Sequence, residues 1–348
     1  MENSYFICSP KDEEIRILRF HNCTWEFGNN KSLVEFGFEI SNNSLAEKKQ
    51  LEISLYIPWF TERCEITDLY QRLKDTANSR FIFNDSVSNS ISLDGGNNTL
   101  GVIHEFTDRN KLCLLPIIVK KEQNKIIIQI NLDHYNRYQA EEKPNIYIRL
   151  SIKPSFPYIS TRKKGIAKST VIYDIKINER RNIPNNLVNE ISGKEICKIE
   201  NCFSFTILPN RYDILFHDNK SLKNIRNLEH TLFHNYIGSI IKIPKDELIV
   251  IFCKKGNTEE SYSFFSIYST ERIGIAQFSF AILLNIFCSL LFYIASLKYT
   301  PKESFGYDVF IFELPIEVYS ATALFLLTLV YFLWPFVRNF FSTIKRRK

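Results

Sequence analysis

The chain has 348 residues, of which 45% are hydrophobic and 24% charged, and its formal net charge is +6. About 270 residues precede a C-terminal apolar region, which is enough for one large domain or two ordinary ones with a sizeable core. Because the chain holds only 11 glycines, glycine-rich phosphate loops are scarce, and this argues against a nucleotide-hydrolysing enzyme.

The positive charge is concentrated toward the C-terminal end. Lys and Arg outnumber Asp and Glu in segments 156–270 and 271–348 but not in segment 1–155. This distribution favours contact with anionic lipid headgroups, to which each well-placed cation contributes about 1 kcal/mol. A site for a phosphate-bearing ligand is the sharper alternative, and direct nucleic-acid binding is not favoured.

Alternating apolar residues dominate the first 155 residues. Four segments have the apolar/polar alternation of half-buried strands, namely Val34–Ile40, Leu51–Ile57, Ile126–Leu132 and Ile146–Ile152. A short amphipathic helix is predicted over Ile66–Leu73, because its apolar residues recur at helical spacing. The pattern predicts a mainly β part built as an antiparallel β-sandwich or barrel with a few short helices.

Two prolines, Pro154 and Pro157, mark a predicted boundary between two β-rich domains. The first covers residues 1–155, and the second, more basic one covers residues 156–270. Alternation continues in the second domain, over segments 171–177, 203–207, 248–253 and 262–268. One helix is predicted there over Ser221–His234, because leucine and isoleucine recur on one side of a helix drawn over these residues.

The eight cysteines are spread along the chain, and the closest pair, Cys197 and Cys202, is not a CxxC motif. In a cytoplasmic setting we expect reduced thiols, mostly buried as small hydrophobic side chains.

No catalytic signature is found in the sequence, and neither a catalytic residue nor a cofactor is predicted. The chain lacks a GxxxxGK[ST] phosphate loop, a GxGxxG loop after a strand, a GxSxG elbow and an HExxH motif. The most suggestive metal-like cluster is His217, Asp218, His230 and His234, in which the last two share a helical i, i+4 spacing. We interpret these histidines as ordinary surface or packing residues, and a metal-dependent enzyme is the minor alternative.

The strongest feature of the soluble part is the basic loop Ser160–Thr170. It contains Arg162, Lys163, Lys164 and Lys168 together with four hydroxyl side chains and one glycine. Such a loop can contact the phosphates of a lipid or ligand, so these four cations are candidate binding residues. The alternative is a flexible, solvated β-turn.

Two long apolar segments, residues 273–297 and 318–337, make up most of the C-terminal region 271–348. A transmembrane helix needs about 20 apolar residues, so the sequence predicts an α-helical transmembrane hairpin. A basic tail follows the second segment, and positive charge prefers the cytoplasmic side. The N-terminal residues form no signal peptide, so we expect a multi-pass protein of the inner or plasma membrane with both termini in the cytoplasm.

Both predicted spans contain polar side chains, and neither contains a charge. An amide that faces lipid has no hydrogen-bond partner, so Gln277 and Asn285 of the first span should face another helix or water. Together with Ser320 and Thr328 of the second span, they are candidates for helix assembly or pore lining. The alternative is contact between the two helices of one hairpin.

A soluble β-rich part joined to a two-helix membrane module resembles the membrane effectors of bacterial anti-phage defence systems. The resemblance implies an antiviral effector that a ligand or partner triggers to oligomerise and to disrupt or gate the membrane. Its partners would be membrane lipids, further copies of itself, and a cytosolic protein or a small phosphate-bearing signal. The alternative function is a membrane-anchored scaffold that recruits a soluble partner.

Overall fold

The chain folds into two compact units, residues 1–270 and 271–348. The computed structural model describes residues 3–27, 31–45, 48–156, 159–165, 168–183, 187–228, 230–238, 240, 248–256, 260–271, 275–298 and 315–344. The first unit is mainly β and the second is helical.

The first unit contains a nine-stranded sheet in the order β16-β19-β13-β1-β4-β10-β9, with β12 paired to β13 and β14 paired to β1. Its strands are β1 (Asn3–Ser9), β4 (Gln50–Tyr56), β9 (Ile118–Glu122), β10 (Lys125–Asn131), β12 (Thr161–Lys164), β13 (Lys168–Ile177), β14 (Glu195–Ile196), β16 (Asp213–His217) and β19 (Tyr262–Glu271).

A ten-stranded sheet lies opposite, in the order β17-β18-β15-β2-β3-β11-β8-β7-β6, with β5 paired to β11. Its strands are β2 (Arg16–Glu26), β3 (Ser32–Ile40), β5 (Glu65–Asp68), β6 (Val87–Ser92), β7 (Val102–Phe106), β8 (Leu112–Leu114), β11 (Asn145–Lys153), β15 (Lys198–Pro209), β17 (Leu222–Leu228) and β18 (Leu248–Gly256).

Both sheets are mixed, which corrects the prediction of a purely antiparallel fold. β1 pairs with β13, β2 with β15 and β8 with β11 in parallel. The first two pairs join strands that are far apart in sequence, as parallel pairing requires a long crossover connection. As a result, segments 1–155 and 156–270 each contribute strands to both sheets.

The main core lies between the two sheets, where alternate residues of each strand meet. On the ten-stranded sheet, Phe20, Phe36 and Leu150 are fully buried and belong to this core. Leu55 and Ile128 face them from the nine-stranded sheet. Burial of a large apolar side chain contributes about 1.5–3 kcal/mol, so this layer carries most of the stabilisation of the first unit.

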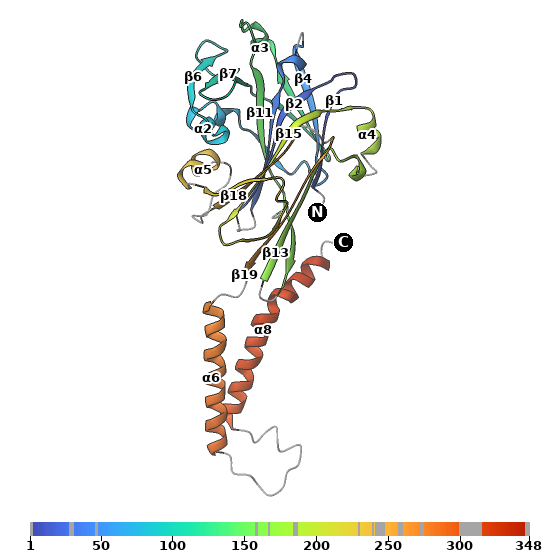
Figure 1. Ribbon diagram of the computed structural model, residues 1–348. Helices are drawn as coiled ribbons and strands as arrows, with labels where there is room; N and C mark the ends of the chain where they lie inside the picture. Colours follow the sequence, from blue (N-terminus) through green and yellow to red (C-terminus); the bar gives the residue numbers. More distant parts are fainter. Residues whose placement is uncertain are drawn as a thin grey trace. The chain divides into compact units, whose positions relative to one another are not determined.

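Short helices flank the two sheets. They are η1 (Asn42–Ser44), α1 (Tyr70–Leu73), α2 (Thr76–Phe83), α3 (Asp133–Arg137), η2 (Arg180–Asn182), α4 (Val188–Ser192) and α5 (His230–Ile237). α2 and α5 lie on one side of the first unit and α4 on the other (Figure 1). Side chains of α2 and α5 join a second apolar cluster on the outer face of the ten-stranded sheet.

Two helix predictions are wrong in part. Residues 66–73 form the end of β5 and then α1, and residues 221–234 form β17 and then α5. In the second case β17 adds to the edge of the sheet by pairing with β18 along Leu222–Leu228. This long-range pairing overrides a local pattern that also fits a helix.

The second unit contains two helices that pack along each other, α6 (Ile275–Lys298) and α8 (Ile316–Ile344). Ala295 of α6 and Ala321 of α8 are buried at their contact, and Lys298 pairs with Glu317. By length and composition, one helix, Phe278–Lys298, can cross a membrane, while Ile316–Val330 is a shorter apolar helix within the described residues. The structure therefore supports one candidate span, and the second predicted span stays a prediction.

The prediction of buried cysteines is confirmed. Seven of the eight are buried, and Cys288 in α6 is half-buried. Burial raises the pKa of Cys8, Cys23 and Cys197 to about 12, so these thiols stay protonated at neutral pH.

Candidate functional site

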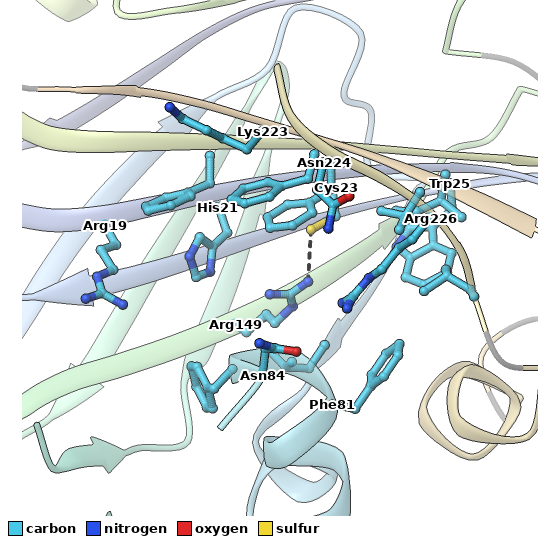
Figure 2. Close-up of a pocket in the computed structure, with 18 of the residues that line it drawn as sticks. Arg19, His21, Cys23, Trp25, Phe81, Asn84, Arg149, Lys223, Asn224 and Arg226 are labelled. Carbon is cyan, nitrogen blue, oxygen red and sulfur yellow. Dashed lines mark hydrogen bonds between the residues drawn. The ribbon is translucent and has the colours of Figure 1, made fainter. Parts of the chain in front are cut away.

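A cavity of about 380 Å³ lies on the outer face of the ten-stranded sheet, between the strands and the C-terminal end of α2. Its volume falls in the range of small-molecule sites, roughly 300–1,000 Å³. Figure 2 shows Phe81 and Asn84 facing the strand residues His21, Cys23 and Trp25 across this space. The cavity therefore has walls from elements far apart in sequence.

Strand alternation explains why these side chains point outward. In β2, Phe20 belongs to the core between the sheets, whereas Arg19 and His21 line the cavity on the opposite face. In β11, Leu150 points to the core and Arg149 to the cavity. A two-residue period therefore gives one sheet an apolar inner face and a cationic, aromatic outer face.

A bulge in the edge strand β17 brings two consecutive side chains to the cavity. The pairing register with β18 shifts between Leu222 and Asn224, and both Lys223 and Asn224 line the cavity. An extra residue in one strand re-aims the side chains beside it. Arg226, further along β17, also points into the cavity (Figure 2).

Arg149 forms the charged floor of the cavity, and a buried network holds it. Its Nε and Nη2 donate to Glu35 Oε2 at 2.9 and 2.6 Å, and Nη1 donates to Tyr147 Oη at 3.0 Å. Nη2 also donates to Cys23 Sγ at 3.0 Å. Because the arginine is 3% exposed and its carboxylate partner fully buried, removal of either charge would leave the other unpaired.

Three further groups fix this network in place. Tyr236 of α5 donates to Glu35 Oε2 at 3.2 Å, which ties the helix to the floor of the cavity. The Tyr147 hydroxyl lies 2.9 Å from His21 Nδ1 and can donate to it, because the same oxygen accepts from Arg149. A Cβ at Gly37 would collide with that hydroxyl, so glycine leaves the space that Tyr147 occupies.

The cavity is electrostatically positive. None of its described lining residues is acidic. Five cationic side chains line it, namely Arg19, Arg109, Arg149, Lys223 and Arg226. Glu39 lies behind the lining and pairs with Arg19 at 3.5 Å and Arg109 at 3.3 Å. Within the part of the chain that the structure describes, no acidic group pairs with Lys223 or Arg226.

The pKa of His21 responds to this environment. Burial, followed by the positive charges of Arg149, Arg109 and Arg19, holds the pKa of His21 well below its usual value. The imidazole is therefore neutral at physiological pH, and a neutral Nδ1 suits the hydrogen bond from Tyr147. His21 thus adds a ring to the cavity without adding a charge.

An aromatic wall, made by Phe203, Phe205 and Phe252, forms one side of the cavity. The planes of Phe205 and Phe252 differ by 7° with centroids 4.7 Å apart, and those of Phe203 and Phe252 differ by 9° at 5.9 Å. All three rings are half-buried and line the cavity. Their common orientation offers a stacking surface for another planar ring.

A second cavity of about 500 Å³ adjoins the first. The two share Phe81, Asn84, Arg226 and Leu228, and the second also contains Arg80. Arg226 therefore stands at the junction, with space on both sides. The combined shape suits an elongated ligand whose charged part meets Arg226.

The basic loop that the sequence singled out forms the β12–β13 hairpin, away from this cavity. Arg162 turns inward and donates to Glu26 Oε2 at 2.5 Å, while Lys163, Lys164 and Lys168 are exposed. The four cations therefore do not all point to one place. Contact with lipid or ligand phosphates stays a prediction for these four cations.

Two of the three histidines of the metal alternative, His217 and His234, lie on different elements of the first unit. His217 lies in β16 of the nine-stranded sheet, with Nε2 3.1 Å from Cys253 Sγ. His234 is exposed on α5, and the side chain of His230 lies outside the described residues. Among the described residues, no group of three His, Cys, Asp or Glu side chains could hold a metal ion.

The candidate assembly residues of the helices separate into two groups. Thr328 is half-buried on α8, and its hydroxyl donates to Leu324 O at 2.8 Å. Asn285 and Ser320 are exposed, and the side chain of Gln277 lies outside the described residues. Asn285 belongs to a shallow groove on α6 together with Ser289 and Tyr293, so its amide does not serve the contact with α8.

The comparisons with known proteins give no family for this chain. No family model matches it, and no curated protein matches it. The interpretation of the cavity therefore depends on its own geometry and charge.

The residues of this cavity are not among the site residues predicted from the sequence, although the strands carry a signal for them. Arg19, His21, Cys23 and Trp25 alternate with the buried residues Phe20, Asn22 and Thr24, and Phe203 and Phe205 flank the buried Ser204. When the outward-facing residues of an alternating strand are aromatic and cationic rather than simply polar, they indicate a candidate binding surface. That signal is split among β2, β11, β15, β17 and β18, so only the fold assembles it.

Proposed function

We propose that the protein is a membrane-embedded effector whose β-rich unit binds a small anionic ligand in the cavity of the ten-stranded sheet. Binding triggers assembly of several copies, and the C-terminal helices then disrupt or gate the membrane. The observation that carries the proposal is a cavity with five cationic lining residues and no acidic one among the described residues, in a chain with a candidate membrane span.

The cavity suits an anion for a physical reason. Lys223 and Arg226 have no acidic partner among the described residues, and Arg149 is held rigidly by Glu35. Charge-assisted hydrogen bonds from such cations to a carboxylate or phosphate are about twice as strong as neutral ones. An arginine that its neighbours already hold loses little conformational freedom when the ligand binds.

The helical unit supports assembly in the membrane. In this proposal both α6 and α8 cross the bilayer, with both termini in the cytoplasm. Asn285 is then an amide on the lipid-facing side of α6, and an amide in hydrocarbon needs a partner. A second copy of α6, packed along the groove of Asn285 and Ser289, supplies that partner.

Dye release from vesicles that contain the full-length protein tests this function. We expect release to rise more steeply than linearly with protein density when pyrophosphate, as the probe of the cavity, is present. Asn285→Leu should abolish release. The matched control is Thr322→Val, because Thr322 is also exposed on a helix but its hydroxyl donates to Val318 O at 2.8 Å. Equal release from Asn285→Leu and wild type would contradict assembly through α6.

A membrane-anchored scaffold is the second candidate, and one observation favours it. Ile214, Leu215 and Phe216 of the edge strand β16 are exposed, beside the exposed ring of Phe265. An apolar edge strand is a common docking surface for a protein partner. In that case an unrelated two-helix anchor would restore function, whereas the effector requires these particular helices.

A further inference from the structure

The ligand of the cavity needs a planar part as well as an anionic part. Phe203, Phe205 and Phe252 hold nearly parallel rings on one side, and Phe81 of α2 lies across the cavity. Aromatic and imidazole rings outnumber the aliphatic lining residues, which are Ile82, Ile207, Leu228 and Val250. A lipid chain would gain nothing from parallel rings, whereas a planar heterocycle extends their stack.

Two amide side chains at the cavity are available to read the edge of such a ring. Asn84 ends α2 in the left-handed conformation, with φ of 53°, and Asn224 sits at the bulge of β17. Both are exposed, and no side-chain hydrogen bond to either amide is found in the described part of the chain. An amide offers a donor and an acceptor side by side, which matches the edge of a nucleobase.

The cations lie where a charged group attached to the ring would reach. Arg226 borders both cavities, and Arg80 continues the positive charge into the second cavity, whereas Lys223 lies three residues before Arg226 on β17. Figure 2 shows the Arg226 and Arg149 side chains pointing into the same space. Arginine can bind a phosphate through two hydrogen bonds, so a phosphate group attached to the ring suits these side chains.

From these observations we infer that the cavity is a nucleotide site. The base stacks on Phe205 and Phe252 and is read by Asn84 and Asn224, and the phosphates bind Arg226. This inference rests on the proposed function and names the chemical class of its ligand. Stacking of one base on an aromatic side chain raises affinity roughly 5–150-fold, so the base should contribute measurably beyond the phosphates.

Calorimetric titration of the full-length protein in detergent micelles tests the inference. The probes are pyrophosphate, the four nucleosides, and ADP, GDP, CDP and UDP. We expect at least one nucleoside diphosphate to bind at least 10-fold tighter than both pyrophosphate and its own nucleoside. A fatty acid, oleate, serves as the probe of the lipid alternative and should not compete.

Two variants separate the roles of the ring and the charge. Phe252→Leu should reduce nucleotide affinity at least fivefold and leave pyrophosphate affinity unchanged, and Phe265→Leu on the other sheet is its control. Arg226→Gln should weaken pyrophosphate and nucleotide alike at least 10-fold, and Arg181→Gln, at a side chain that is 87% exposed, is its control.

The outcomes distinguish failure of the inference from failure of the proposed function. If pyrophosphate binds through Arg226 but no nucleotide binds more tightly, the nucleotide assignment is overturned and the anion site stands. If oleate displaces pyrophosphate and nucleotide alike, the nucleotide assignment is overturned in favour of a lipid. If Phe252→Leu leaves the preference for nucleotide intact, the base does not stack on this aromatic wall and the inferred geometry is overturned. If neither pyrophosphate nor any nucleotide binds, both the site and the function proposed from it are overturned.

Discussion

The two faces of the ten-stranded sheet follow opposite rules, although the same strands build both. On the inner face, β11 contributes Ile148 and Leu150 to an apolar core, and on the outer face it contributes Tyr147 and Arg149 to a charged network. The inner face stabilises the fold through close packing of apolar side chains. The outer face holds its buried charges in pairs and leaves a cavity open beside them. Substitutions on the inner face should therefore lower mainly the free energy of unfolding, and substitutions on the cavity wall should lower mainly ligand affinity.

The largest expected effect comes from the charge pair beneath the cavity. Glu35→Gln leaves Arg149 buried without its counter-ion, and we expect a loss of about 3–5 kcal/mol in the free energy of unfolding. Urea unfolding of the full-length protein in micelles, followed by Trp fluorescence, measures it. The control is Glu65→Gln, whose pair with Lys153 is exposed and should contribute under about 1 kcal/mol. A loss for Glu35→Gln as small as that for Glu65→Gln would show that the buried charge pair contributes little to the stability of the fold.

The next prediction compares one substitution on each face of the sheet by its effects on stability and on ligand affinity. Ile148→Ala removes a buried inner side chain and should cost about 3 kcal/mol while leaving pyrophosphate affinity unchanged. Phe205→Ala on the half-buried outer wall should cost less stability and lower nucleotide affinity at least fivefold. The reverse pattern, with binding lost by Ile148→Ala and kept by Phe205→Ala, would contradict the division of roles.

A third substitution tests whether the inner face requires apolar side chains, because it replaces a buried polar residue there with an apolar one. Asn22 is fully buried on that face, and neither its amide oxygen nor its nitrogen has a partner among the described residues. Asn22→Leu should stabilise the protein by about 1–3 kcal/mol, because it removes two polar atoms from an apolar layer. Loss of stability in the unfolding assay would mean that the inner face needs a polar group at this position.

The smallest effect is the pH dependence of stability from His21. Burial and the charges of Arg149, Arg109 and Arg19 lower the pKa of its folded form, so the unfolded chain binds a proton that the folded chain does not. Stability from this residue is present above the unfolded pKa and is lost as the pH falls below it. Between pH 7.5 and 5.5 the wild type should lose about 1.4 kcal/mol more than His21→Gln. Parallel pH profiles would contradict a neutral buried imidazole.

The sequence predicted the β character of the first unit well, because strand alternation is a local property. Val34–Ile40 and Ile146–Ile152 were both predicted as strands and lie within β3 and β11. The parallel pairing of β2 with β15 could not be predicted, because it joins residues about 180 positions apart that share no local signal. The same limit explains β17, where the partner strand β18 decides between strand and helix.

The candidate site was harder to predict than the fold. Charge density drew attention to Arg162, Lys163, Lys164 and Lys168, yet Arg162 is already paired with Glu26. The five cations of the cavity are spread over β2, the β7–β8 connection, β11 and β17, with two of them on β17, so the sequence does not group them in one basic segment. A binding surface assembled from isolated residues becomes visible only when the fold places them on one face.

Dye release tests the coupling of the cavity to the membrane helices most directly, in vesicles that contain either wild type or Arg226→Gln, upon addition of the nucleoside diphosphate that binds the wild type most tightly. We expect release from the wild type and none from the variant, with both proteins present in the vesicles in equal amounts. Equal release from both proteins, or no release from a wild type shown to bind the nucleotide, would contradict the coupling of the cavity to the membrane helices.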